Sequence, residues 1–205
     1  RTLKLENECD PIEYSNLDAD GHIVSPIFHE ILDDVFKKIK SDSNFLFVDP
    51  QGFLRQKDSN NNIILKKTDL DLSNVNAIKI NPEEGQNIVS GSHDEMMLAL
   101  QKKGIEYVLL TNKTDVSLLV KNRVYSLKLP NKNIHDTTGI GDIFCSAFTC
   151  TMLKEKDFLW ALCFAAGSAQ AALESNAVGL QKIPKKGMVE NNASYFYNLV
   201  DFRDL

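Results

Sequence analysis

Short apolar runs alternate with stretches of helical periodicity along most of the chain. The apolar runs predict strands over 22–26, 45–48, 77–80 and 107–111. Apolar residues three and four positions apart predict helices over 28–39, 92–103, from about 141 onward, and over about 157–174. A hairpin is predicted over 117–127 with its turn at Lys121 and Asn122, and the Asn-rich segment 56–74 is predicted to be a loop that turns at 60–62.

This alternation of strands and helices predicts an α/β fold, with three α/β/α layers in a Rossmann-like arrangement around a mostly parallel sheet. In open parallel sheets, ligands bind beyond the carboxyl ends of the strands. Polar residues follow several of the predicted strands, namely Asp49 and Gln51, Asn81 and Glu84, and Thr111. We therefore expect a functional site at that edge of the sheet.

The composition and charge of the chain exclude some classes of protein. The 205 residues are 43% hydrophobic, which suits a single domain with its own core. A net charge of -5 argues against a nucleic-acid partner, and the absence of any run of 18 apolar residues argues against a membrane span. The four cysteines form no C-x-x-C pair, so we expect free thiols in a cytoplasmic protein.

The segment most indicative of chemistry is Asp-Thr-Thr-Gly-Ile-Gly-Asp at 136–142. Gly139, Ile140 and Gly141 stand at a predicted helix start, where backbone N–H groups lack internal partners and the helix dipole is positive. They predict an anion cradle suited to a phosphoryl group. Asp142, beside it, is predicted to accept the proton of an attacking hydroxyl. The alternative is a glycine-rich turn followed by an ordinary acidic residue in a first helical turn.

Residues 136–144, with the pattern D-T-T-G-x-G-D-x-F, resemble the C-terminal signature of the PfkB (ribokinase-like) family of small-molecule kinases. Ile140 stands where that family usually has alanine. The resemblance extends over about 22–184 and implies ATP as donor, Mg²⁺ as cofactor, and a sugar, polyol or nucleoside as acceptor. Family members are longer, so we expect 1–11 to be a remnant of their β lid, 12–205 the kinase core, and the missing lid to support a homodimer.

Two metal sites are implied by the same resemblance. Asn81 and Glu84 match the family motif N-x-x-E, which implies Mg²⁺ near Asn81 and bound through water by Glu84, exposed at a helix start. The alternative is a plain helix start with Pro82 at its first position. Asp136 and Thr138 match residues that help the family bind K⁺; alternatively, Asp136 braces its loop by hydrogen bonds to backbone N–H groups.

Nucleotide contacts are also implied by the family pattern. They are expected at Thr138, at Thr111, Asn112 and Lys113, and along the wall of the adenine pocket at Ala165, Ala166 and Ala169. The family has glycines near 113 and 116, which this chain lacks, so the loop is expected to differ in shape. Plain helix packing is the alternative for the three alanines.

Gln51 and Arg55 follow a predicted buried strand, in a segment similar to one beside the active site of PfkB-like kinases. Arg55 is expected to meet the transferring phosphoryl group or an anionic substrate. A surface turn is the alternative for this segment.

The sequence thus predicts a kinase that phosphorylates a hydroxyl of a sugar or of a polyol such as an inositol. A nucleoside kinase and an ADP-dependent sugar kinase share these motifs. From another class, a non-catalytic ligand-binding paralogue is suggested by the altered loop at 111–116. The retention of Asp142 with both glycines argues against that paralogue.

Overall fold

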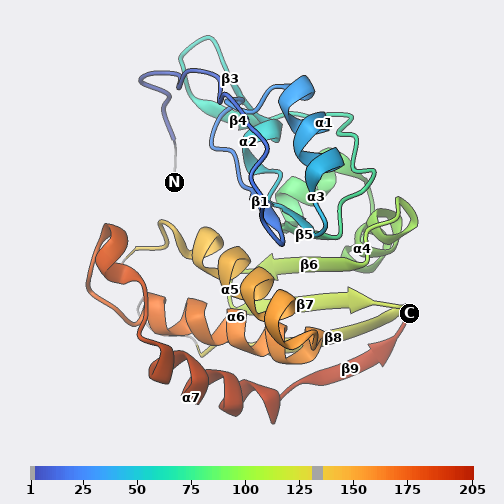
Figure 1. Cartoon of the computed structure of the whole chain (residues 1–205), viewed down its shortest axis with the longest axis vertical. Helices are drawn as coiled ribbons and strands as arrows, with labels where there is room; N and C mark the ends of the chain where they lie inside the picture. The colour runs from blue at the N-terminus through green and yellow to red at the C-terminus, as the bar shows by residue number, and fades with distance from the viewer. Residues whose placement is uncertain (1–2, 131–135) are drawn as a thin grey trace. The chain divides into compact units, whose positions relative to one another are not determined.

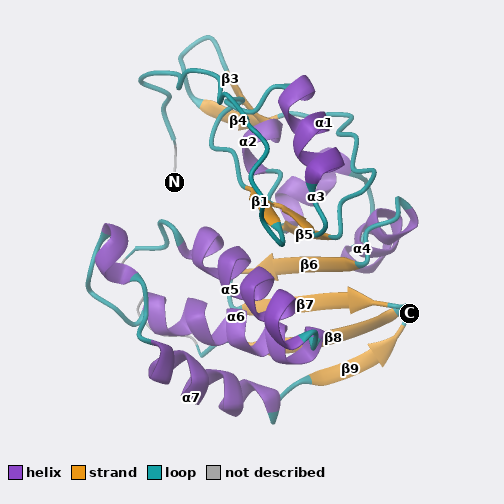
Figure 2. Cartoon of the chain, in the orientation of Figure 1, coloured by secondary structure: helices purple, strands orange, loops and turns teal. Residues whose placement is uncertain are grey.

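The structure is a computed structural model that describes residues 3–130 and 136–205. The chain forms two compact units, Arg1–Leu110 and Thr111–Leu205. Figure 1 shows the path of the chain and Figure 2 its helices and strands.

Parallel strands form the sheet of the first unit: β1 (His22–Val24), β2 (Leu46–Val48), β5 (Ala77–Ile80) and β6 (Tyr107–Asn112), whose last two residues pass into the second unit. Every residue of β2 and β5 is buried, as expected for strands covered on both faces. The four strands predicted from apolar runs are confirmed. The α/β fold class is confirmed with them, in a mixed, mostly parallel arrangement of strands.

The helices of the first unit are α1 (Asp33–Asp42), α2 (Gln51–Leu54), α3 (Pro82–Ile88) and α4 (His93–Lys102). The helix predicted over 28–39 begins only at Asp33. The reason is that the Glu30 carboxylate accepts the N–H groups of Ile27 and Phe28, at 2.6 and 2.7 Å, which closes a turn instead of a helix. α2 was not predicted, because four residues are too few for a periodic pattern.

The segment predicted as a loop over 56–74 contains all but the first residue of an antiparallel hairpin, formed by β3 (Arg55–Lys57) and β4 (Ile63–Leu65). The predicted turn within it is confirmed. Asp58 Oδ1 accepts the N–H groups of Asn60 and Asn62 at 2.8 and 2.9 Å, and Asn61 has a φ of 62°. The backbone N–H of Leu5 donates to the carbonyl of Asn61, and the Leu3 carbonyl accepts the N–H of Ile63. The N-terminal segment thus lies alongside the hairpin.

The second unit contains the antiparallel strands β7 (Asp115–Val120), β8 (Arg123–Lys128) and β9 (Asp201–Asp204). The predicted hairpin is confirmed, since Lys121 and Asn122 have φ values of 47° and 64°, the conformation of a tight two-residue turn. β9 was not predicted. All four of its residues are exposed, so no apolar face marks it in the sequence.

The helices of the second unit are α5 (Ile140–Glu155), α6 (Phe158–Leu173) and α7 (Lys186–Tyr197), with the 3₁₀ helix η1 (Gly179–Lys182) before α7. α6 packs against both α5 and α7 (Figure 1). It reaches the sheet through Phe158, whose ring centroid lies 5.2 Å from that of Tyr125 on β8. α5 begins within one residue of its predicted start.

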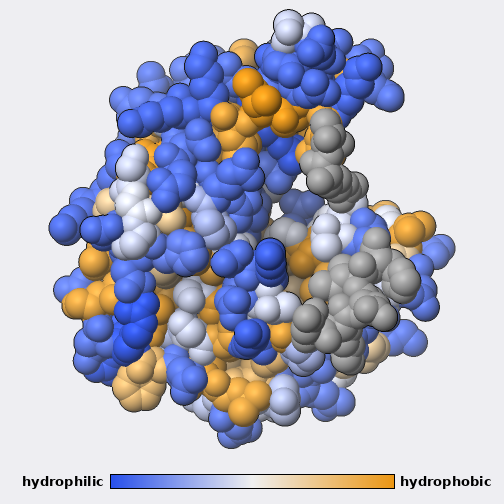
Figure 3. All heavy atoms as spheres, turned by 180° about the vertical axis from the view of Figure 1, so that it is seen from behind, coloured by the Kyte–Doolittle hydropathy of each residue, from blue (hydrophilic) through white to orange (hydrophobic). Residues whose placement is uncertain are grey.

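On the face shown in Figure 3, hydrophilic residues cover most of the surface and hydrophobic residues form smaller areas between them. This agrees with a chain of which 25% is charged. Among the helices in the described ranges, none combines the length and the apolar character that crossing a membrane requires.

The contact between α6 and α7 depends on Gly167. A Cβ atom at this position would lie 2.8 Å from the carbonyl oxygen of Val189 and 2.9 Å from the amide nitrogen of Ala193. These are backbone atoms, so the helices must separate to admit a methyl group. We predict that Gly167→Ala lowers the free energy of unfolding by about 1–3 kcal/mol.

The matched control is Gly187→Ala on α7, because an added Cβ there meets nothing within 4 Å. Its free energy of unfolding in urea should stay within about 0.5 kcal/mol of the parent or rise slightly. Equal effects of the two substitutions would contradict a close helix contact at Gly167.

Candidate active site

The glycine-rich segment forms the entry to α5. Gly139 is its N-cap residue, with a φ of 76°, a left-handed conformation that favours glycine. A Cβ atom at Gly139 would meet nothing within 4 Å, so the space beside it is open. Ile140, Gly141 and Asp142 form the first turn, where N–H groups have no intrahelical partner. The Ile140 N–H contacts the carbonyl of Thr137 at 3.3 Å, so this donor is already engaged within the loop.

Asp136 holds the loop that leads into this turn. Its Oδ1 accepts the backbone N–H and the hydroxyl of Thr138, at 2.9 and 2.7 Å. The ammonium of Lys182, on η1, donates to Asp136 Oδ2 at 3.1 Å. Hydrogen bonds from Thr138, followed by that from Lys182, hold the pKa of the Asp136 carboxyl well below its usual range. Asp136 is therefore an ionised brace of the loop.

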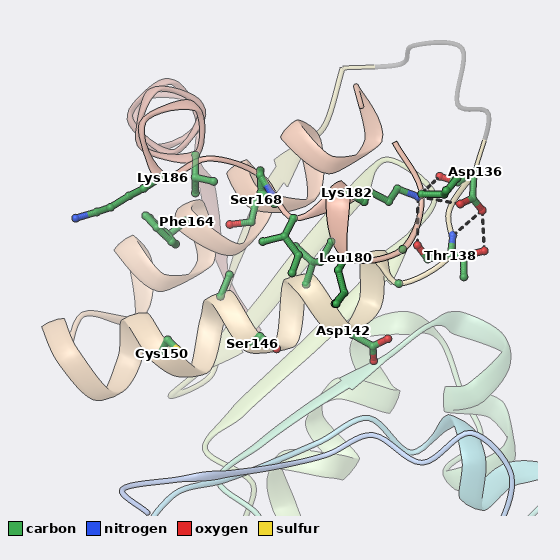
Figure 4. A pocket seen from close by; sticks show the side chains of 18 residues that line it. Asp136, Thr138, Asp142, Ser146, Cys150, Phe164, Ser168, Leu180, Lys182 and Lys186 are labelled. Carbon is green, nitrogen blue, oxygen red and sulfur yellow. Dashed lines mark hydrogen bonds and ion pairs between the residues drawn. The ribbon is translucent and has the colours of Figure 1, made fainter. Parts of the chain in front are cut away.

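A cavity of about 800 Å³ lies along α5 within the second unit. Four predicted site residues line it: Asp136, Thr138, Gly139 and Asp142. Much of the remaining lining is apolar and comes from α5, α6 and the segment 178–189: Ile143, Ala147, Phe164, Val178, Leu180, Ile183, Pro184 and Val189. In Figure 4, Asp136, Thr138, Lys182 and Asp142 gather at one end, and Cys150 and Phe164 lie toward the other. The cavity thus has a polar end at the cradle and an apolar body.

The alanines expected to wall an adenine pocket do not line this cavity. Ala165 and Ala166 are fully buried and Ala169 is 2% exposed, and none is among the residues that line the cavity. Phe164 and Ser168, four residues apart on another face of the helix, line it instead. The small side chains let α6 pack closely against its neighbouring helices.

Asn81 and Glu84 form a capping box at the start of α3. Asn81 Oδ1 accepts the Glu84 N–H, and Glu84 Oε2 accepts the Asn81 N–H, both at 2.9 Å. The expectation that Glu84 is exposed is wrong, since only 2% of it is accessible. Burial raises the pKa of its carboxyl above the ordinary value. The motif therefore has the structural role given as its alternative, and its carboxylate retains acceptor capacity beyond that one bond.

Charged residues collect around Glu84 within the first unit. Asp49 and Lys79, 4% and 8% exposed, form an ion pair of 2.6 Å at the ends of β2 and β5. Burial lowers the pKa of the Arg55 guanidinium. The negative charges of Glu84 and Asp49 act against this lowering. The Gln51 N–H contacts Asp49 Oδ1 at 3.3 Å. The structure thus assembles the polar groups expected at these two strand ends.

The loop after β6 contains no glycine, yet one of its residues has the backbone conformation that favours glycine. Lys113 is exposed and has a φ of 53°. Thr111 and Asn112 end the strand, and neither they nor Lys113 line the cavity.

Lys182 was not predicted from the sequence. It lies 46 residues after Asp136 and in no motif, so only the folded chain brings it to the loop. No group of three or more His, Cys, Asp or Glu side chains within 3–130 and 136–205 is arranged to hold a metal ion.

A glycine-rich helix start with an aspartate beside a cavity is suited to bind a phosphoryl group next to a proton acceptor, which are two requirements of a kinase. The sequence pattern described as pfkB family carbohydrate kinase matches residues 4–186. The chain belongs to this family and is a phosphotransferase that acts on a hydroxyl group. A comparison with curated proteins gave no significant match.

Solved structures of ribokinase-like kinases share the fold. A pyrophosphate-dependent kinase in the ribokinase family is 21% identical with a TM-score of 0.78, over 93% of this chain and 69% of that one. A pyrophosphate-dependent myo-inositol-1 kinase is 20% identical with a TM-score of 0.79, over 96% and 71%. Ribokinase from Arabidopsis thaliana, complexed with ribose and ATP, is 19% identical with a TM-score of 0.64, over 83% and 55%.

Proposed function

We propose that the protein transfers the γ-phosphoryl group of ATP to a hydroxyl of a sugar or of a polyol such as an inositol. The observation that carries the proposal is the position of Asp142 on the first turn of α5, at the polar end of the cavity. The similarity in fold to a myo-inositol kinase and a ribokinase supports this class of acceptor.

In this mechanism the acceptor hydroxyl oxygen attacks the γ-phosphorus while the bond from that phosphorus to the β,γ-bridging oxygen breaks, so that ADP leaves. The Asp142 carboxylate accepts the proton of the hydroxyl. The N–H groups of the first turn donate to the phosphoryl oxygens, whose negative charge is spread over them in the transition state. Gly139 makes room for the phosphoryl group because it has no side chain. Arg55 is proposed to bind an anionic group.

The donor is proposed to be ATP because of the apolar body of the cavity. Asp142 and Cys150 both line it on α5, and eight residues of helix correspond to about 12 Å. A donor whose phosphates lie at Gly139–Asp142 therefore needs an apolar part to fill the region near Phe164. The nucleoside of ATP has such a part, whereas pyrophosphate, on which the two pyrophosphate-dependent neighbours named above rely, has none.

Magnesium is proposed as the cofactor, and Glu84 would hold it through a water ligand with Asn81 nearby. Magnesium takes few protein ligands and keeps several waters, which suits a site with one carboxylate and one amide. Burial, together with the negative charge of Asp49, raises the pKa of the Glu84 carboxyl, and the positive charges of Lys79 and Arg55 act against this rise.

The first prediction concerns the base. Asp142→Asn should lower kcat by a factor of about 100 or more, because the amide does not accept the hydroxyl proton. The matched control is Asp157→Asn, the same substitution at the N-cap of α6, where the side chain only accepts N–H groups. Steady-state kinetics of both variants test the role. A kcat of Asp142→Asn within a few-fold of the parent would contradict it.

The second prediction concerns magnesium. Glu84→Gln should raise the magnesium concentration needed for half-maximal activity by about tenfold or more. Glu95→Gln is the control, because Glu95 closes an equivalent capping box with Ser92 on α4. Both variants lose a capping carboxylate, so a shared fall in melting temperature reports capping alone. If the two magnesium titrations coincide, Glu84 has only that structural role.

The third prediction concerns the donor. Cys150 is exposed and lines the cavity, Cys9 is exposed in the other unit, and burial raises the pKa of Cys163 to about 12. A maleimide should therefore label Cys150 and Cys9 first. A non-hydrolysable ATP analogue should slow labelling of Cys150 and leave Cys9 unchanged, whereas pyrophosphate should protect neither. Peptide mapping by mass spectrometry measures this. Protection of Cys150 by pyrophosphate, or none by the analogue, would contradict the proposal.

A further inference from the structure

Lys182 is a buried lysine whose bonding capacity is fully used. It is 3% exposed. Its ammonium donates to the carbonyl oxygens of Asp136 and Thr138, at 2.8 and 3.2 Å, and to Asp136 Oδ2 at 3.1 Å (Figure 4). An ammonium has three N–H donors, and each has an acceptor here. The charge is thus held in one place by the loop at 136–138.

This loop leads directly into the cradle. Asp136 Oδ1 is occupied by Thr138, so the side chain turns its other oxygen to Lys182. The next residue, Gly139, begins α5. The carbonyls of Asp136 and Thr138 are therefore fixed toward the ammonium. A positive charge at this point also adds to the positive end of the helix dipole, which favours a negative phosphoryl group.

Two backbone carbonyls and a carboxylate oxygen form a set of hard oxygen donors of the kind that binds an alkali-metal ion. In this protein the set surrounds an ammonium instead. A K⁺ ion at the same oxygens would have to displace Lys182 and leave its charge buried without a partner, which is costly. The oxygens expected to bind K⁺ therefore do not fit an exchangeable ion while Lys182 is in place.

We propose that Lys182 is a positioning residue that supplies a permanent cation behind the cradle, in place of an exchangeable monovalent cation. The part of this proposal that concerns catalysis rests on the proposed function. Because the cation is a side chain of the same protein, it is present at every salt composition. The enzyme should accordingly work at equal rates in Na⁺ and K⁺.

The test compares the parent enzyme with Lys182→Met, which keeps the apolar stem and removes the charge. Melting temperatures and kcat are measured in NaCl, KCl and RbCl at constant ionic strength. The parent should give the same melting temperature and kcat in all three salts. Lys182→Met should melt lower and turn over about tenfold more slowly in NaCl, and KCl or RbCl should restore much of both losses.

Lys40→Met is the matched control. Lys40 is 6% exposed, and its ammonium also donates to three oxygens, from Asp71 and Ser73 in the first unit. The Asp71 side chain is 61% exposed, so water can replace the lost ammonium. Lys40→Met should lower the melting temperature equally in all three salts. The comparison of the two variants distinguishes the effect of removing a buried lysine in general from the effect of removing a cation at the cradle.

Activation or stabilisation of the parent by K⁺ over Na⁺ would overturn the proposal. So would a Lys182→Met variant that responds identically to the three salts. The melting experiment needs no turnover, so it decides the cation site even if the proposed reaction is wrong. Restored stability with unchanged kcat would confine Lys182 to a structural role and overturn the catalytic part.

Discussion

The candidate site depends on how the chain enters α5. A helix start offers N–H groups without internal partners, and they bind an anion only if the preceding loop holds them open and in place. Gly139 allows the left-handed turn, and Asp136 fixes the loop through Thr138 on one oxygen and Lys182 on the other. The buried ammonium pairs with the ionised Asp136 beside the site proposed to bind a phosphoryl group. The proposed cradle, the proposed base and this positive charge all depend on one braced turn.

The cavity adds a second constraint, which concerns the donor. Its lining changes from charged residues at the cradle to apolar residues such as Phe164 and Val189. This gradient matches a ligand with phosphates at one end and a flat apolar group at the other. The fold alone leaves the donor open, because kinases of the same fold are described with pyrophosphate and with ATP. The proposal of ATP as donor for this protein therefore rests on the side chains that line the cavity and not on the fold.

Much of the fold was predictable because the sequence carries its local signals. Strands such as 77–80 are apolar throughout, and the glycines at 139 and 141 mark the start of α5. The exposed strand β9 has no apolar face, and Lys182 acquires its role only through a contact across 46 residues of sequence. Glu84 was expected to be exposed at a helix start. The sequence pattern of a capping box does not reveal whether the glutamate side chain is buried, as it is here.

The central claim is that ATP donates its γ-phosphoryl group to an acceptor hydroxyl at the start of α5. The most direct measurement is ³¹P NMR of the enzyme with Mg²⁺, a panel of sugars and polyols that includes myo-inositol, and either ATP or pyrophosphate. The account predicts that ATP is converted to ADP with an equal amount of a phosphomonoester of one acceptor, and that pyrophosphate gives no such signal. A phosphomonoester formed from pyrophosphate but not from ATP, or from neither donor with any acceptor, would contradict it.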